Sequence, residues 1–357
     1  MKRLLLVLSL SLTLSLSLFA QPTRYALALS GGYTLPNSEE WSYVSSATFG
    51  VAGTMAWQFK GDDYWTPLRH NPLFGLRVEW LHANNAIAGE RFGLQGFLQQ
   101  PLFTTSDGAH QLSWTLDGGI SLYTRPYRRT FDDPNIFIGS YINCLIGAGV
   151  QMTSRISSST SLTYGVRFCH ASNGYLRKPN QGLNYIQAEV GYGFHSDSAA
   201  RMRSQHLVLP PSHLFLSYAP GLVQARNGLS DQLYFFTHTA QIGYLFNLSP
   251  LRGVGANVDF MFNYSHNAIA DDEGVPRPFP LYVGIAANYE TSWDRLFFRV
   301  ALGAYLYKSQ LCSYPIYERM GIYYRFGSHL HQYAGVAFKA HYAHVDYIEW
   351  TYGIELF

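Results

Sequence analysis

The sequence predicts an all-β protein, a transmembrane antiparallel β-barrel of about sixteen strands. Three observations favour this class. Only 13% of the 357 residues are charged, about half the usual share of a soluble domain. Aromatic residues are abundant, with 27 Tyr and 23 Phe, as the aromatic girdles of a membrane barrel require. Beyond the N-terminal segment, apolar residues alternate with polar ones and form no run long enough for a transmembrane helix.

Residues 1–20 are typical of a secretory signal peptide. Lys2 and Arg3 precede an apolar or small run that ends at Ala20, before a polar residue. The run is short for a spanning helix, which disfavours the alternative of a membrane anchor. No Cys follows Ala20, so a lipoprotein anchor is also disfavoured. We therefore expect export, and the barrel class then places the protein in the bacterial outer membrane.

Strand-like segments recur over the rest of the chain, and no convincing amphipathic helix is found. The alternation is clearest at 296–308, where Phe298, Val300 and Leu302 share one side and Arg299 lies on the other. The expected strands are 24–33, 48–59, 73–83, 91–103, 110–124, 136–155, 160–172, 183–194, 213–224, 233–247, 253–266, 279–291, 296–308, 316–326, 331–342 and 346–357.

The last strand closes with Glu355, Leu356 and a terminal Phe357, which resembles the C-terminal signal of bacterial outer-membrane proteins. The barrel-assembly machinery reads that signal, so we expect it as a partner during biogenesis. Both termini of such a barrel lie in the periplasm, which requires an even number of strands. The loop 173–182 would then face the cell exterior, and the short turn 156–159 would be periplasmic.

A weak internal repeat divides the chain. Residues 165–168 are echoed by 335–338, and the polar stretch 195–212 would be a periplasmic connection between two sets of strands, 21–194 and 213–357. Two arrangements are compatible with this division: one barrel of about sixteen strands, or two successive barrels of eight. The single barrel is favoured, because strands can continue across a long periplasmic connection.

Composition also excludes several kinds of site. The net charge is only +2 and no basic block is present, so no nucleic-acid partner is expected. Cys144, Cys169 and Cys312 are an odd number without metal-like spacing. The 13 His form no close HxxxH or HExxH pair, so no metal site is assigned.

Three polar residues lie at the ends of two apolar rows. The face of strand 160–172 that carries Phe168 is apolar and must meet lipid, and His170 and Ser172 continue this face. On the next strand, Asn184 shares the face of Ile186. All three side chains are therefore expected on the lipid-facing wall, near the exterior interface.

These residue types suit acyl transfer. A Ser hydroxyl becomes nucleophilic when a neighbouring base takes its proton, and His170 is suited to do so for Ser172 near neutral pH. Asn184 could orient the imidazole. Asn180, with a backbone N–H near Gly174, could stabilise an oxyanion. The alternative is that these are ordinary interfacial polar residues at a strand end, followed by an Asn-Gly turn.

The motif His-x-Ser-Asn-Gly at 170–174, followed by Pro-Asn-x-Gly at 179–182 and a strand of alternating apolar residues, resembles the lipid A 3-O-deacylase family of PagL-like outer-membrane esterases. That resemblance implies an eight-stranded barrel with Ser and His on its outer wall. It also implies Ser172 as nucleophile, His170 as base and Asn180 as an oxyanion donor.

The resemblance is specific over 160–194, looser over 24–194, and says nothing about 213–357. One residue departs from the family pattern: the acidic third member of the catalytic group falls at Asn184. An Asn can orient a neutral imidazole but does not stabilise imidazolium by charge. Asn184 in place of an acidic residue therefore affects the expected rate of catalysis more than the expected roles of the residues.

The function expected from this resemblance is hydrolysis of an ester-linked acyl chain of lipid A, in lipopolysaccharide of the outer leaflet, without a cofactor. Arg177 and Lys178 could contact the lipid A phosphates, or be solvated loop cations. Alternatives are a phospholipase with the same three residues, or a non-enzymatic pore or structural barrel.

His341 repeats the motif's His without a following Ser, and is expected to be lumenal or structural.

Overall fold

The computed structural model describes residues 23–58, 65–87, 89–128, 133–196, 209–224, 234–327, 331–342 and 344–357. The expected signal peptide and most of the expected connection 195–212 lie outside the described residues. All sixteen expected strands are present. Their bounds are β1 Arg24–Leu35, β2 Ala47–Gln58, β3 Leu73–Ala83, β4 Glu90–Thr104, β5 His110–Tyr123, β6 Ile142–Arg155, β7 Thr160–Ser172, β8 Leu183–His195, β9 His213–Gln224, β10 Tyr234–Ser249, β11 Arg252–Asn263, β12 Leu281–Trp293, β13 Leu296–Tyr307, β14 Ile316–Phe326, β15 His331–His341 and β16 His344–Leu356.

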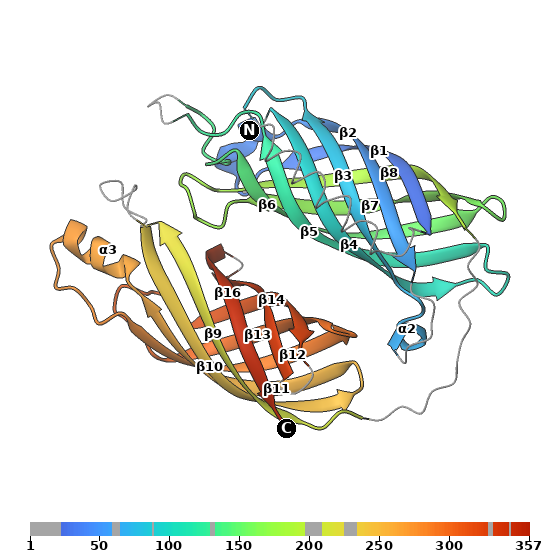
Figure 1. Ribbon diagram of the computed structural model, residues 1–357. Coiled ribbons are helices and arrows are strands. Elements are labelled where there is room, and N and C mark those ends of the chain that lie inside the picture. Colours follow the sequence, from blue (N-terminus) through green and yellow to red (C-terminus); the bar gives the residue numbers. More distant parts are fainter. Residues whose placement is uncertain are drawn as a thin grey trace, which may run out of the picture.

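The strands form two closed antiparallel barrels of eight strands each (Figure 1). In the first, β8 pairs with β1 from Arg24↔His195 to Leu35↔Asn184. In the second, β16 pairs with β9. The all-β barrel class is confirmed, but the favoured single barrel is not formed, and the alternative of two successive barrels is the one observed. The reason is that β1 occupies the free edge of β8, so no edge remains for β9.

Two strand boundaries differ from the expectation by more than two residues. Strand β6 starts at Ile142 rather than 136, because Asn135 Oδ1 accepts hydrogen bonds from the N–H groups of Phe137 and Ile138 and holds a loop there. Strand β11 ends at Asn263, because its Oδ1 accepts the N–H of Ser265, where a helix begins.

The helices, which the sequence did not predict, are η1 Glu39–Val44, α2 Trp65–Leu68 and α3 Ser265–Glu273. Within the described ranges, none has the length and apolarity to cross a membrane.

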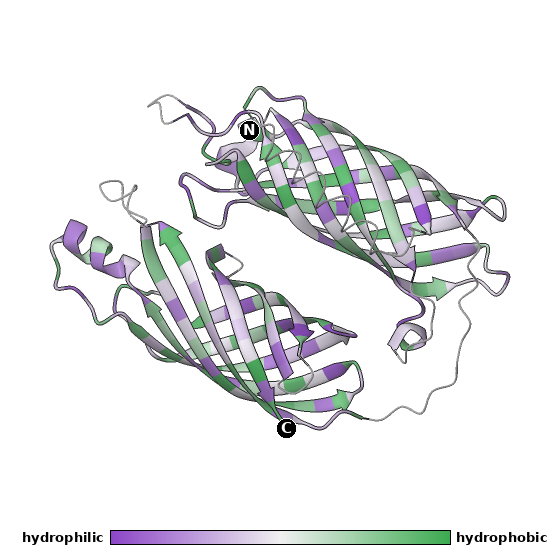
Figure 2. Cartoon of the chain, in the orientation of Figure 1, coloured by the Kyte–Doolittle hydropathy of each residue, from purple (hydrophilic) through white to green (hydrophobic). Residues whose placement is uncertain are grey.

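The predicted faces of the strands are confirmed. On β7, Leu162, Tyr164, Val166 and Phe168 point outward and are 36–53% exposed, whereas Arg167 points inward and is 4% exposed. Figure 2 shows the resulting alternation of hydrophobic and hydrophilic residues along the strands. The long connections 36–46, 124–141 and 173–182 share one end of the first barrel, called the loop end below; the opposite end is the turn end. In outer-membrane barrels, long loops face the cell exterior.

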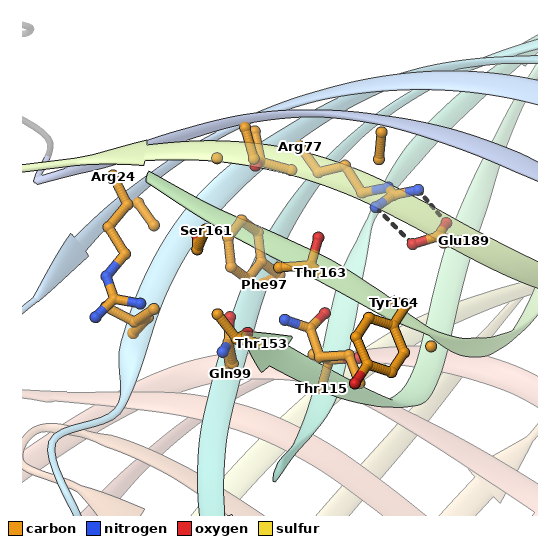
Figure 3. Close-up of a pocket in the computed structure, with 18 of the residues that line it drawn as sticks. Arg24, Arg77, Phe97, Gln99, Thr115, Thr153, Ser161, Thr163, Tyr164 and Glu189 are labelled. Atoms are coloured by element: carbon orange, nitrogen blue, oxygen red, sulfur yellow. Dashed lines mark hydrogen bonds and ion pairs between the residues drawn. The ribbon is translucent and has the colours of Figure 1, made fainter. Parts of the chain in front are cut away.

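The interior of the first barrel is filled by charged side chains. Glu79 contacts Arg77 at 2.9 Å, Arg167 at 3.4 Å, and Arg91. Towards the turn end lies a cavity of about 110 Å³, where Arg77 pairs with Glu189 (Figure 3). At the loop end, the barrel mouth is closed by a buried apolar cluster that includes Val44, Phe137, Ile138, Leu145 and Tyr185.

The interior of the second barrel is filled in the same way. Arg299 pairs with Glu290 at 2.8 Å, and Arg319 pairs with Glu349 at 2.7 Å and with Asp259 at 3.0 Å. His341 is buried at 4% exposure and is 2.8 Å from the hydroxyl of Tyr305, as expected for an inward-facing residue. Charged side chains thus lie inside both barrels.

Candidate active site

The three candidate catalytic residues lie together at the loop end of the first barrel, on its outer wall. In the β7–β8 pair His170 is directly opposite Asn184, and in the β6–β7 pair Ser172 is opposite Cys144. Directly opposite residues in an antiparallel pair place their side chains on the same face, within contact distance. His170, Ser172 and Asn184 are all partly buried and continue the outward rows, as the sequence predicted.

A hydrogen bond joins His170 Nδ1 to Asn184 Oδ1 at 2.7 Å. Because an amide oxygen only accepts, Nδ1 carries the proton and Nε2 keeps its lone pair. Asn184 Nδ2 donates in turn to Asn37 Oδ1, and Asn37 Nδ2 donates to the carbonyl of Gln181 at 2.7 Å. This chain of bonds fixes both the tautomer and the orientation of the imidazole.

Asn37 was not predicted from the sequence. It precedes η1 in the loop after β1, and only the closure of β1 against β8 brings it to the site. The end of that pairing, Leu35↔Asn184, shows how close the two segments lie. Neither spacing nor composition around Asn37 signals this contact.

Gly182 lies against the imidazole ring. Its φ is +75°, in the left-handed region that favours glycine. A Cβ added there would lie 2.5 Å from His170 Cε1 and 3.0 Å from Nε2. The glycine is thus needed both for the backbone conformation and for the position of the ring.

Ser172 follows His170 on the same face, at a Cα spacing of roughly 6.5 Å for residues two apart in a strand. In the described part of the chain, no hydrogen bond joins the Ser172 hydroxyl to His170. Such a bond often becomes short only when substrate is bound. The arrangement therefore places a hydroxyl and an imidazole next to each other on the outward face of β7.

The loop after Ser172 is held by amide side chains. Asn180 Oδ1 accepts the N–H of Asn173 at 3.0 Å, which leaves Asn180 Nδ2 as its donor group. Asn173 Nδ2 donates to the carbonyl of Arg177 at 2.7 Å and to Ser140 Oγ at 3.0 Å. The structure thus brings Asn180 against the residue that follows Ser172, and Asn180 is only 6% exposed.

The two predicted phosphate-binding cations belong to this loop. Arg177 N–H donates to Asn173 Oδ1 at 3.3 Å, and Lys178 Nζ lies 5.9 Å from the centre of the Tyr175 ring. Both side chains are partly buried. Among the described residues, no group of three or more His, Cys, Asp and Glu is arranged to hold a metal ion.

Two models of known protein families match the chain, one over each barrel. Residues 51–193 match the model described as Lipid A 3-O-deacylase (PagL), and residues 212–357 match the model described as Acyloxyacyl hydrolase, C-terminal domain. The chain belongs to the PagL family of outer-membrane lipid A deacylases. The first match contains all the candidate site residues except Asn37. PagL membership supports hydrolase activity and places this barrel protein in the outer membrane.

The chain also matches solved structures at low sequence identity. A crystal structure of the outer membrane enzyme PagL is 15% identical and covers 46% of this chain and 97% of that one, with a TM-score of 0.35. The outer membrane protein opdK from Pseudomonas aeruginosa is 11% identical over 95% and 99% of the two chains, with a TM-score of 0.24. A mutant porin of Rhodopseudomonas blastica is 10% identical over 94% and 99%, with a TM-score of 0.19.

No curated protein is similar enough in sequence to match. The family assignment rests on the two family models alone.

Proposed function

We propose that this chain is a serine esterase that removes an ester-linked acyl chain from lipid A. Ser172 is the nucleophile, His170 the base, and Asn184 the group that orients the imidazole. The observation that carries the proposal is the 2.7 Å bond from His170 Nδ1 to Asn184 Oδ1 on the outward wall, because it leaves Nε2 free to accept the Ser172 proton. Membership in a lipid A deacylase family supplies the substrate class.

The reaction proceeds by acyl transfer and needs no cofactor. Ser172 Oγ attacks the ester carbonyl carbon while His170 Nε2 takes the hydroxyl proton. The tetrahedral oxyanion accepts hydrogen bonds from Asn180 Nδ2 and the N–H of Gly174. His170 then gives its proton to the departing sugar oxygen. Water, activated by the same imidazole, cleaves the acyl-enzyme and releases a fatty acid.

The substrate reaches this site by lateral diffusion in the outer leaflet, since the catalytic row faces lipid rather than the lumen. The cations of Arg177 and Lys178, on the loop beside Ser172, would attract the phosphates of the lipid A headgroup. During biogenesis the barrel-assembly machinery would recognise the last strand, β16, and its terminal Phe357.

The decisive experiment is mass spectrometry of lipid A incubated with the purified chain. Loss of one hydroxyacyl chain is expected with the native protein and not with the Ser172→Ala variant. A parallel incubation with phospholipid vesicles separates the two ester substrates. Unchanged lipid A with cleaved phospholipid would replace the proposal by a phospholipase, and unchanged lipid in both, with a folded barrel, would refute an esterase.

Asn184→Asp is expected to increase the deacylation rate about tenfold. A carboxylate stabilises the imidazolium that forms in the transition state, and a charge-assisted bond is roughly 1.4 kcal/mol stronger than a neutral one, a factor of ten. Asn37 can turn its amide to donate to the new carboxylate, at the loss of its hydrogen bond to the Gln181 carbonyl.

Rate measurements across pH on the native chain, Asn184→Asp and Asn184→Ala test this expectation. The alanine variant should be slower than the native chain, because nothing then orients the ring. Equal rates for all three would show that Asn184 does not orient His170 in the reaction.

A further inference from the structure

The second barrel contacts the loop that carries the proposed oxyanion donors. Gln224, the last residue of β9, accepts the N–H of Lys178 on its Oε1 at 2.8 Å. Its own N–H donates to the carbonyl of Tyr175 at 3.3 Å. One residue of the second barrel therefore bridges two points of the loop 173–182 of the first.

A second contact lies beside this bridge. A Cβ added to Gly174 would be 2.6 Å from Ile348 Cδ1, so the Ile348 side chain of β16 packs directly over this glycine. Gly174 has φ +61° and the next residue, Tyr175, has φ +63°. A left-handed conformation at a non-glycine residue persists only where its surroundings hold it, and the bond from Gln224 to the Tyr175 carbonyl does so.

The exposed fractions of the side chains show that this contact covers only one end of the outer wall of the second barrel. On β16, the outward-facing Trp350 and Tyr352 are 47% and 49% exposed, as lipid-facing residues should be. Ile348, in the same row, is 4% exposed, and Gln224 is 1% exposed. A buried glutamine on an apolar outer wall needs polar partners, and the backbone of the loop provides them.

The bridge also determines where the oxyanion donors lie. Gln224 holds the stretch from Tyr175 to Lys178, and Asn173 binds that stretch through the carbonyl and N–H of Arg177. The N–H of Asn173 in turn donates to Asn180 Oδ1, and this bond holds the Asn180 side chain in place. Movement of the loop away from the second barrel would therefore move both Gly174 and Asn180 relative to Ser172.

We infer that the second barrel serves as a positioning domain for the active site of the first, with Gln224 as the main positioning residue and Ile348 as its apolar support. This inference rests on the proposed function, because it assigns to the loop the role of oxyanion stabilisation. It gives residues 213–357 a task that needs no catalytic group of their own.

The test compares full-length variants in deacylation of lipid A. Gln224→Ala is expected to lower kcat about tenfold or more with little change in KM, because the lost interaction acts on the transition state. Gln224→Glu keeps an oxygen that accepts the Lys178 N–H, and should stay within about threefold of the native rate. Should Gln224→Ala fail to fold, Ile348→Ala tests the same support, with the same expected loss of kcat.

The matched control is Arg69→Ala, which removes a contact between the barrels at the turn end. Arg69 Nη2 donates to the carbonyls of Ser292 at 2.8 Å and Leu251 at 3.1 Å, far from the loop. Its rate should stay within about twofold of native, because apolar contacts that include Trp65 and Trp293 remain there.

Three results would overturn the positioning role: a native rate in Gln224→Ala, an equal loss in Arg69→Ala, or no recovery in Gln224→Glu. Absence of deacylation by the native chain would instead refute the proposed function.

Discussion

Replacing Ser172 or His170 with alanine is expected to lower the rate constant for lipid A deacylation by about 10⁴-fold or more. Without the hydroxyl no acyl-enzyme forms, and without the imidazole the hydroxyl keeps its proton. The two residues act as a unit, so the double variant should be no slower than the slower single variant. Single-turnover rates with purified protein in lipid A micelles measure this.

The matched control for these variants is Ser161→Ala. Ser161 lies near the other end of β7, points into the first barrel and is 7% exposed. Its loss should leave the rate unchanged, because it is separated from the substrate by the barrel wall. Multiplicative losses in the double variant, or a full rate in Ser172→Ala, would contradict the assignment of nucleophile and base.

The sequence was sufficient to predict the strands and their faces, because a membrane barrel places one simple demand on every strand. Outward residues must be apolar and inward ones need not be, so the period of two is visible at β7 and β13. The way the barrels close was not predictable from that pattern. Both arrangements need the same alternation, and the difference lies in whether β8 pairs with β1 or β9.

The candidate site was predictable for a related reason. His170, Ser172 and Asn184 lie in one hairpin, so alternation alone places them on a common face. Asn37 and Gln224 reach the site through contacts between distant segments, the first by barrel closure and the second by contact between the barrels. Local sequence patterns contain no information on such contacts.

The largest loss of stability is expected from Glu79→Leu. Glu79 is 2% exposed and lies among Arg77, Arg91 and Arg167 inside the first barrel. Arg91, itself 1% exposed, has no other carboxylate partner among the described residues. Removing one partner from a buried ionic group leaves uncompensated charge, which costs about 3–5 kcal/mol. The free energy of unfolding in urea, with the barrel reconstituted in lipid vesicles, measures the loss.

A double variant separates this electrostatic cause from altered packing. In Glu79→Leu with Arg91→Met, the most buried unpaired charge is gone, so part of the lost stability should return. Asp271→Asn breaks an exposed ion pair with Arg277 and should have little effect on stability. If the double variant were no more stable than Glu79→Leu, unpaired charge on Arg91 would not be the cause. The ionic filling of the first barrel would then matter for packing rather than for charge balance.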